Sequence, residues 1–539
     1  MVSKQKAGPA DAAARIAAGY DFTGTALDLG AVVLDNVAHP DARVRIPLSM
    51  MTRHGLIAGA TGTGKTRTLQ LLAEQLSARG VPVVLADLKG DLSGLAAAGT
   101  ADDRITERAT ETGDDWTPQA FPVEFLALGG LGTGIPVRAT MTAFGPTLLA
   151  KVLELNATQE SSLQLVFHYA DQAGLPLLDL KDLRAVISYL VGAEGKTDLK
   201  SLGGLSGATA GVILRELIAL SDHGGDVFFG EPEWDTRDLL RVGADGRGII
   251  SSVELSAVQD KPQLFSTFLM WLLADLFHEL PEVGDVDQPK LVFFFDEAHL
   301  LFDGASKDFL DSVTQTVRLI RSKGVGIFFV TQNPTDVPND VLGQLGNRVQ
   351  HALRAFTPDD ATALAKAVRT FPKTTDYDLA ELLTQLGTGE AVVTVLSDRG
   401  APTPVAWTRL VPPRAGMGQL DPAAQHQAVA SSTLAPKYTA AVDRDSAYEM
   451  LAARLAPPSE APSGSQAPAD GAAGQPSAGA DRPGGGGNGA VGGGELAAAG
   501  GVVGAVLGSA AFRSFARSAA SSLGRQITRD LFGTAKRRR

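Results

Sequence analysis

The chain has 539 residues, which is enough for a large core or for two to three domains. Its formal net charge of −12 argues against a uniformly basic coat for nucleic acid but allows a local basic channel. The sequence contains no cysteine, so disulfides, thiolate zinc sites and cysteine nucleophiles are excluded.

The N-terminal segment resembles a short lead-in to a larger fold. Residues 1–50 hold two strand-like pieces, at 31–34 and 44–46, and the core is expected to span residues 51–415. The start lacks the apolar run of a secretory signal, and no apolar run is long enough to cross a bilayer. We therefore expect a cytoplasmic protein.

A glycine-rich loop follows the first strand of the expected core. Residues 59–66 read Gly-Ala-Thr-Gly-Thr-Gly-Lys-Thr, between the apolar run 56–58 and a helical pattern at 67–76. This order of strand, loop and helix is the context that a P-loop requires, in which backbone N–H groups and the helix N-terminus face phosphate oxygens. Lys65 can reach the β- and γ-phosphates, and the Thr66 hydroxyl can bind Mg²⁺. The alternative is a chance glycine-rich turn before an amphipathic helix.

The pattern predicts that one continuous segment binds ATP. Its residues are Gly59, Ala60, Thr61, Gly62, Thr63, Gly64, Lys65, Thr66 and Arg67.

A strand at 81–88, which ends in Asp-Leu-Lys-Gly-Asp-Leu, is expected after the P-loop helix. From about 140 to 222 the spacing of apolar residues is helical, which predicts a helical insertion into the nucleotide-binding fold. A strand at 248–255 and a long amphipathic helix at 262–280 follow.

The unbroken apolar runs 291–295 and 326–330 predict strands that are buried on both faces, as in a parallel sheet. Helical segments alternate with these strands, so helices should cover both faces. Two more strands, near 348–356 and 390–396, should complete the core. The predicted fold class is therefore α/β, with a mainly parallel sheet.

Two adjacent carboxylates, Asp296 and Glu297, follow the first of these buried strands as in a Walker B motif. The carboxyl ends of parallel strands are where open α/β sheets bind ligands. Asp296 is expected to hold Mg²⁺, and Glu297 is expected to orient and polarise the attacking water. The alternative is an ordinary strand end that carries two acids. His299 reads as a group that supports the site from behind rather than as a ligand or base.

Gln332 follows the next buried strand, where a side-chain amide can sense the γ-phosphate and position water. The alternative is that Gln332 lies in a turn and only forms hydrogen bonds with the backbone. An arginine is also expected, because charge spreads over the γ-phosphoryl oxygens in the transition state. Arg321, just ahead of this strand, is the candidate that acts in trans on a neighbouring subunit. Arg318 on the same helix, and Arg348 and Arg354 after the strand, are less favoured.

The C-terminal region divides by composition. A helical segment is expected at 416–455, and residues 456–494, rich in Pro, Gly, Ser and Ala, are expected to be a disordered linker. Residues 495–539 mix arginines with phenylalanines and end in Lys-Arg-Arg-Arg. This basic tail could lie on a membrane surface, bind DNA phosphates or be solvated.

The residues of these motifs resemble the HerA/FtsK division of P-loop ATPases, and most closely the bacterial HerA-like proteins. The match rests on 59–66, 293–299 and 331–334, with support from 87–91 and 341–348, and covers roughly residues 20 to 455. The resemblance implies a RecA-like core with a catalytic glutamate, a hexameric ring around DNA, and ATP bound between subunits with an arginine from the neighbour. The short lead-in and the helical insertion depart from archaeal HerA and leave the ring geometry and the docking of a partner nuclease open.

Two functions follow from this interpretation. The first is an ATP-driven DNA translocase or helicase. The second is a non-motor ATPase, a switch or scaffold that controls a protein partner, suggested by the helical insertion and the tail. A small-molecule kinase is disfavoured because a kinase must exclude water, whereas adjacent Asp296 and Glu297 suit water activation.

Overall fold

The computed structural model describes residues 9–303 and 307–455. The chain divides into a compact unit that ends at Leu451 and a second unit that begins at Ala452. The linker predicted at 456–494 and the basic tail predicted at 495–539 lie outside the described residues. Within the described ranges, no helix is both long and apolar enough to cross a lipid bilayer.

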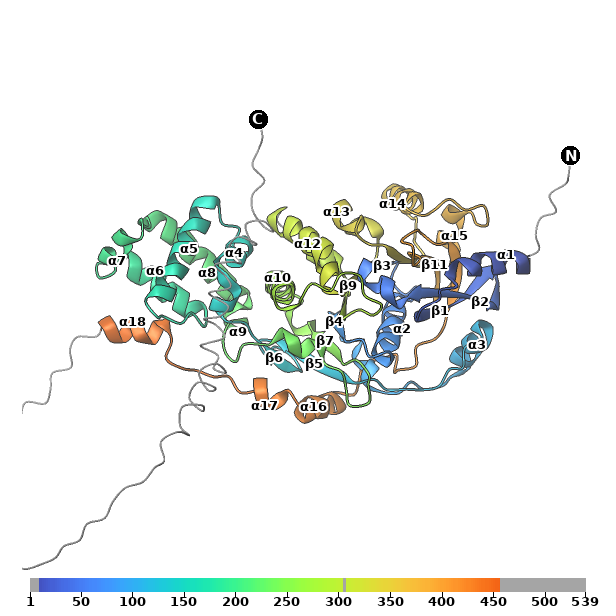
Figure 1. Cartoon of the computed structure of the whole chain (residues 1–539), viewed down its shortest axis with the longest axis horizontal. Helices are drawn as coiled ribbons and strands as arrows, with labels where there is room; N and C mark the ends of the chain where they lie inside the picture. Colours follow the sequence, from blue (N-terminus) through green and yellow to red (C-terminus); the bar gives the residue numbers. More distant parts are fainter. Residues whose placement is uncertain (1–8, 304–306, 456–539) are drawn as a thin grey trace, which may run out of the picture. The chain divides into compact units, whose positions relative to one another are not determined.

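One mixed sheet of 12 strands organises the first unit (Figure 1). The strands are β1 (Ala26–Leu34), β2 (Val37–Pro47), β3 (Gly55–Ala58), β4 (Val83–Asp87), β5 (Val123–Leu128), β6 (Ile135–Val137), β7 (Ile250–Glu254), β8 (Leu291–Phe295), β9 (Val325–Thr331), β10 (Asn347–Gln350), β11 (Glu390–Thr394) and β12 (Ala406–Leu410). Their order is β2-β1-β12-β11-β10-β3-β9-β8-β4-β7-β5-β6.

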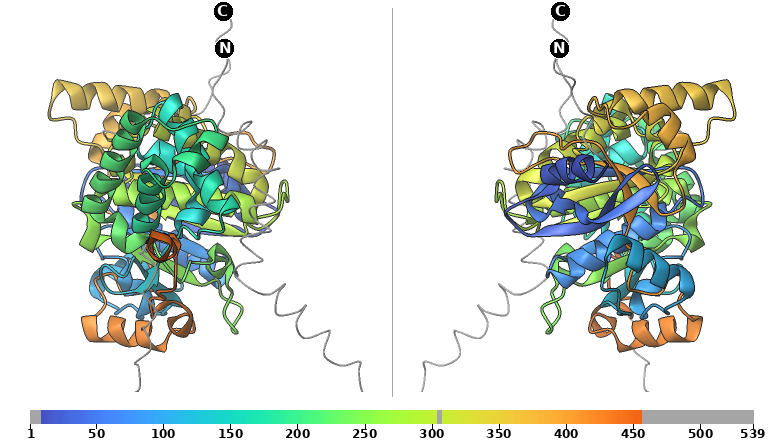
Figure 2. Two further views of the ribbon diagram at one scale, coloured as in Figure 1. Left: turned by 90° about the vertical axis from the view of Figure 1, so that its left-hand side faces the viewer. Right: turned by 90° about the vertical axis from the view of Figure 1, so that its right-hand side faces the viewer.

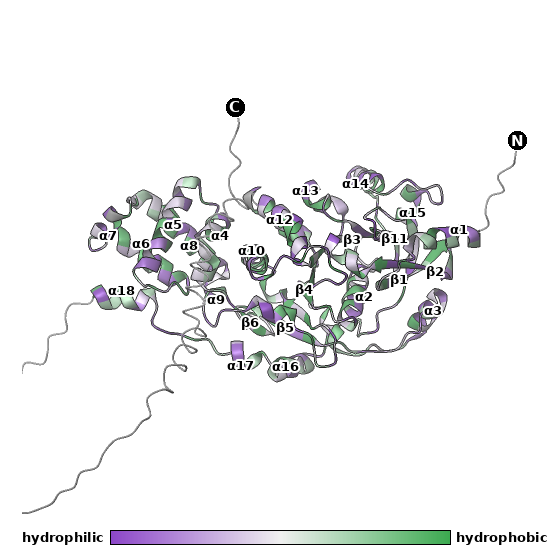
Figure 3. Cartoon of the chain, in the orientation of Figure 1, coloured by the Kyte–Doolittle hydropathy of each residue, from purple (hydrophilic) through white to green (hydrophobic). Residues whose placement is uncertain are grey.

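The strands from β10 to β6 all run parallel, and β11, β12, β1 and β2 add antiparallel pairs at one end. Every residue of β3, β4, β7, β8 and β9 is buried, as unbroken apolar runs in a parallel sheet predict. The predicted α/β class with a mainly parallel sheet is confirmed. Figure 3 shows hydrophobic residues concentrated along the strands, whereas helix α12 carries both colours as an amphipathic helix does.

Helices cover both faces of the sheet and form two large apolar cores with it, and a smaller third cluster includes residues of the two helices at 358–369 and 379–385. One core packs α1 (Pro9–Ala17) and α2 (Lys65–Ala78) against the first face; the other packs α10 (Pro262–Glu279) and α12 (Lys307–Ile320) against the second. The remaining short helices are α3 (Asp103–Thr112), α11 (His299–Phe302), α13 (Asn339–Leu342), α14 (Pro358–Arg369), α15 (Leu379–Gln385), α16 (Pro422–Ser431), α17 (Ala435–Tyr438) and α18 (Ala447–Leu455).

The predicted helical insertion lies between β6 and β7. It comprises α4 (Met141–Val152), α5 (Ala157–Gln172), α6 (Leu180–Val191), α7 (Lys196–Ser201), α8 (Gly207–Leu220) and α9 (Asp226–Phe228). Asn156 and Asp179 each begin a helix with a reciprocal capping box. Figure 2 shows this helical group at one end of the molecule and β1, β2 and α1 at the other.

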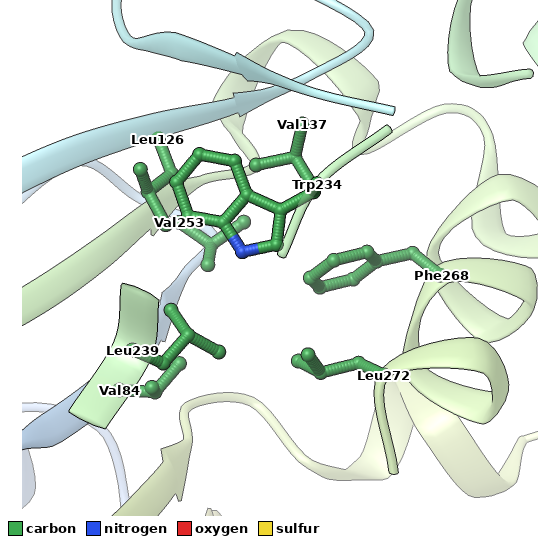
Figure 4. Close-up of a pocket in the computed structure, with 8 residues that line it drawn as sticks. All are labelled: Val84, Leu126, Val137, Trp234, Leu239, Val253, Phe268 and Leu272. Atoms are coloured by element: carbon green, nitrogen blue, oxygen red, sulfur yellow. The ribbon is translucent and has the colours of Figure 1, made fainter. Parts of the chain in front are cut away.

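A small apolar pocket lies where α10 meets the sheet. Phe268 and Leu272 line it from the helix, across from Trp234 and from Val253 of β7 (Figure 4). Its lining is aliphatic and aromatic, so it belongs to the core that joins the insertion to the sheet.

Several expectations for the edges of the core are wrong. The first fifty residues are not only a lead-in, because β1 and β2 are long strands of the main sheet. Strand β10 ends at Gln350 rather than near residue 356, and β12 was not expected. By contrast, the segment expected to be helical at 416–455 does contain helices, namely α16, α17 and α18.

Candidate nucleotide site

The P-loop connects the carboxyl end of β3 to the N-terminus of α2. Gly59, Gly62 and Gly64 have φ angles of 153°, 80° and 116°, which favour glycine. The Gly59 N–H donates to the Thr331 carbonyl at 3.2 Å. No side chain caps the N-terminus of α2 at Gly64, so its first N–H groups remain available for an anion.

The Lys65 side chain curls back over this loop and is 8% exposed. Its Nζ donates to the Ala60 carbonyl at 3.2 Å. Burial lowers the pKa of Lys65, and the nearby carboxylates Glu297 and Asp296 oppose that shift. The P-loop follows β3 and the two predicted acids follow β8, and both strands pair in parallel with β9. Lys65 therefore lies at the same edge of the sheet as Asp296 and Glu297.

The other predicted loop residues fit a phosphate cradle to different degrees. Thr63 Oγ1 donates to the Ala60 carbonyl at 2.7 Å and so supports the loop from within. Thr61 is exposed and Thr66 is partly buried at the start of α2. The Arg67 guanidinium donates to Gln70 Oε1 at 2.6 Å.

His351 packs beneath the P-loop, and the sequence analysis did not include it among the site residues. It follows β10, is fully buried, and its Nε2 lies 2.8 Å from Thr68 Oγ1 on α2. Burial lowers the pKa of His351 to about 4, so the ring is neutral at pH 7. A single histidine after a strand matches no sequence motif. The sequence could have indicated His351 only through its place after β10, the strand that pairs with β3 ahead of the P-loop.

The packing of His351 against the P-loop predicts that two glycine-to-alanine substitutions differ in their effect on stability. A Cβ at Gly59 would lie 2.5 Å from His351 Cβ, whereas one at Gly62 meets nothing within 4 Å. Both positions have positive φ, which costs about 1–2 kcal/mol for alanine. Only Gly59→Ala adds overpacking of about 1–3 kcal/mol. Denaturant unfolding should therefore show a larger loss of stability for Gly59→Ala than for Gly62→Ala, and equal losses would contradict this packing.

Asp296 lies directly after β8 and is 3% exposed. Its Oδ1 accepts the Glu297 N–H at 2.9 Å, and within the described part of the chain no hydrogen bond reaches its Oδ2. Burial, followed by the charge of Glu297, raises the pKa of Asp296 to about 7. A buried carboxylate with an unpaired oxygen is costly unless a cation binds there, so the chemistry of the Asp296 carboxylate fits a ligand for Mg²⁺.

Glu297 has a φ of 49°, an unusual backbone conformation for a glutamate. Its carboxylate is 6% exposed and forms an ion pair with the Lys89 ammonium; His299 Nδ1 lies 3.3 Å from Oε2. Burial favours the neutral acid, but the hydrogen bond and charge of Lys89, together with the charges of His299 and Lys65, outweigh burial and lower the pKa of Glu297. Glu297 is therefore an ionised carboxylate at pH 7, which can accept a hydrogen bond from a water.

Lys89 is the second site residue whose role the sequence did not reveal. It follows β4, and the Asp87 carboxylate holds its loop by accepting the N–H groups of Lys89, Gly90 and Leu92 at 3.1, 2.7 and 3.0 Å. The sequence did contain a clue, namely the polar segment 87–91 directly after a buried strand. The carboxyl ends of parallel strands share one edge of the sheet, so a residue of this segment could have been expected near Glu297.

Gln332 and Arg321 lie at opposite ends of β9. Gln332 is exposed directly after Thr331, on the edge that carries the P-loop and Glu297. Arg321 precedes the strand, and its Nη2 donates to Asp285 Oδ1 at 2.9 Å, with Arg53 on the same carboxylate. A strand of seven residues spans about 20 Å, so Arg321 does not reach the nucleotide site of its own subunit.

Comparison with known proteins places the whole arrangement in a family. A family model described as "Helicase HerA-like C-terminal" matches residues 33–539. The DNA double-strand break repair helicase HerA of Pyrococcus furiosus is 23% identical over 399 residues, which cover 68% of this chain and 67% of that protein.

Two solved structures were also found to be similar to the chain. The bacterial conjugative coupling protein TrwBdeltaN70 has a TM-score of 0.49 at 15% identity and covers 76% of this chain and 94% of its own. VirB4 of Thermoanaerobacter pseudethanolicus has a TM-score of 0.45 at 14% identity, with coverages of 72% and 96%. The family match confirms the resemblance drawn from the motifs, and the chain belongs to the helicase HerA-like C-terminal family of P-loop ATPases.

Proposed function

We propose that this protein is an ATP-hydrolysing DNA translocase or helicase that acts as a ring, with ATP between subunits. The observation that carries the proposal is that the P-loop with Lys65 follows β3, and Asp296 with Glu297 follows β8, at the same edge of one parallel sheet. Only β9 lies between these two strands, although the segments are more than 200 residues apart in the sequence. The Pyrococcus furiosus relative is named as a DNA repair helicase, which supports DNA as the polymer along which this protein moves.

Each group has a role in this chemistry. The loop N–H groups and Lys65 hold the β- and γ-phosphates, and Asp296 with Thr66 holds Mg²⁺, which neutralises charge that develops on the phosphates. Glu297, kept ionised, orients a water and takes its proton as the water attacks the γ-phosphorus. Gln332, one strand away, senses the γ-phosphate and helps to place that water.

The position of Arg321 favours a ring in which neighbours complete each other's sites. Because Arg321 lies at the sheet edge opposite its own P-loop, it would stabilise the transition state of a neighbouring subunit, and a hexamer around DNA fits this use. Mass measurement with and without ATP and DNA tests the assembly. We expect a ring in the presence of both ligands; a persistent monomer would favour a switch that controls a protein partner, such as a nuclease.

DNA should stimulate ATP hydrolysis if the protein is a motor on DNA. We expect the steady-state rate of phosphate release to rise several-fold with single- or double-stranded DNA at low salt, and to fall as salt screens the phosphate contacts. A Lys65→Ala preparation serves as the control for contaminating ATPases. A flat response to both forms of DNA would exclude the translocase and leave an ATPase with another task.

A further inference from the structure

Lys89 is a cation paired with the predicted catalytic base, and the proposed hydrolysis gives its ammonium no contact with the nucleotide. Its ammonium pairs with the Glu297 carboxylate and also feels the charges of Asp296 and Asp91. The Lys89 side chain is 49% exposed, whereas that of Glu297 is 7% exposed. The ion pair therefore joins a fixed, buried carboxylate to a long side chain with room to move.

The γ-phosphate of bound ATP has to lie between Lys65 and the water that Glu297 orients. The Lys89 ammonium is paired with Glu297, and Lys89 follows β4, which pairs in parallel with β8 at the edge of the sheet that carries the P-loop, so it borders the same space. The terminal phosphate carries more negative charge than a carboxylate and offers several oxygens to one ammonium. Lys89 has the long, half-exposed side chain that a move from one anion to the other requires.

We propose that Lys89 is a γ-phosphate sensor that exchanges the Glu297 carboxylate for the terminal phosphate of ATP. The exchange leaves Glu297 free to bind the attacking water only when the third phosphate is present. In the nucleotide-free protein and with ADP, Lys89 stays on Glu297 and occupies the oxygen that the water needs. This inference rests on the proposed ATP hydrolysis and names one more residue of that site.

A purely structural ion pair is the competing explanation, and the loop itself argues against it. Three N–H groups of the Lys89 loop already bind the Asp87 carboxylate, and Gln419 Nε2 donates to the Lys89 carbonyl at 3.2 Å. The backbone is thus held without the lysine side chain. The Lys89 ammonium instead supplies positive charge at the position expected for the γ-phosphate.

The test is the ratio of affinities for a non-hydrolysable ATP analogue and for ADP, measured by calorimetry with Mg²⁺ on the full chain. Lys89→Ala removes the contact to the γ-phosphate and leaves Glu297 uncompensated beside it, so we expect the ratio to fall by about tenfold or more. ADP affinity should stay within about twofold. Lys89→Arg should retain most of the ratio, and Lys89→Met, which keeps the aliphatic stem, should lose it.

Lys437→Ala is the matched control, because that side chain is also 49% exposed and pairs with a carboxylate, Asp238, outside the nucleotide site. It should leave the ratio unchanged. An unchanged ratio in Lys89→Ala, or an equal loss for both nucleotides, would overturn the sensor. Failure of the parent protein to bind either nucleotide would instead overturn the proposed function and the sensor with it.

Discussion

Glu297→Gln should bind ATP normally and hydrolyse it roughly 100- to 10,000-fold more slowly than the parent protein, the range expected when a general base is removed. Glutamine keeps the shape of the side chain, but its amide cannot accept a proton from water. Binding survives because the P-loop and Lys65 are untouched. Single-turnover phosphate release measures the chemical step, and a binding isotherm for ATP checks the affinity.

Glu254→Gln is the control for this experiment. Glu254 ends β7 at the same edge of the sheet, and it is as buried as Glu297, at 6% exposure. Burial and the neighbouring Asp87 raise the pKa of Glu254 to about 7, so it lacks the cation that keeps Glu297 ionised. Its replacement should leave hydrolysis near the parent rate. Equal turnover by Glu297→Gln and the parent, or a larger loss with Glu254→Gln, would show that a residue other than Glu297 is the general base.

The edge of the sheet that carries the site could be predicted because its signals are local. Continuous apolar strands indicated a parallel sheet, and parallel strands place their carboxyl ends together, so Lys65 and Glu297 were expected to meet. Lys89 and His351 could not be assigned in the same way. Their roles depend on contacts with Glu297 and with the P-loop glycines, which no spacing in the sequence encodes.

The antiparallel end of the sheet was missed for a related reason. Strand β1 pairs with β12, so that Gly30 lies opposite Leu410, and nothing local joins segments so far apart. Strand β12 alternates buried and partly buried residues over only five positions, too short a pattern to distinguish a strand from a loop. Without β12 as a partner, the strands β1 and β2 could only be interpreted as a lead-in.

Lys65→Ala should abolish most nucleotide binding, with a loss of affinity for ATP on the order of 100-fold, because one buried ammonium faces both terminal phosphates. Hydrolysis should fall with it. The free protein should remain folded, because the Lys65 ammonium donates to the carbonyl of Ala60 in its own loop and so does not join distant parts of the fold. Fluorescent-nucleotide titration and thermal unfolding of the same preparation separate the two effects.

Lys323→Ala distinguishes loss of a phosphate contact from loss of any buried lysine. Lys323 is 9% exposed, its Nζ donates to the Leu280 carbonyl at 2.8 Å, and it pairs with Glu282 at 3.2 Å. It precedes β9, at the edge of the sheet opposite the P-loop, so its removal should lower the unfolding temperature and leave ATP affinity intact. Lys65→Ala should show the reverse pattern. If both variants lost stability and kept their nucleotide affinity, Lys65 would be a structural lysine and the loop would not be a phosphate site.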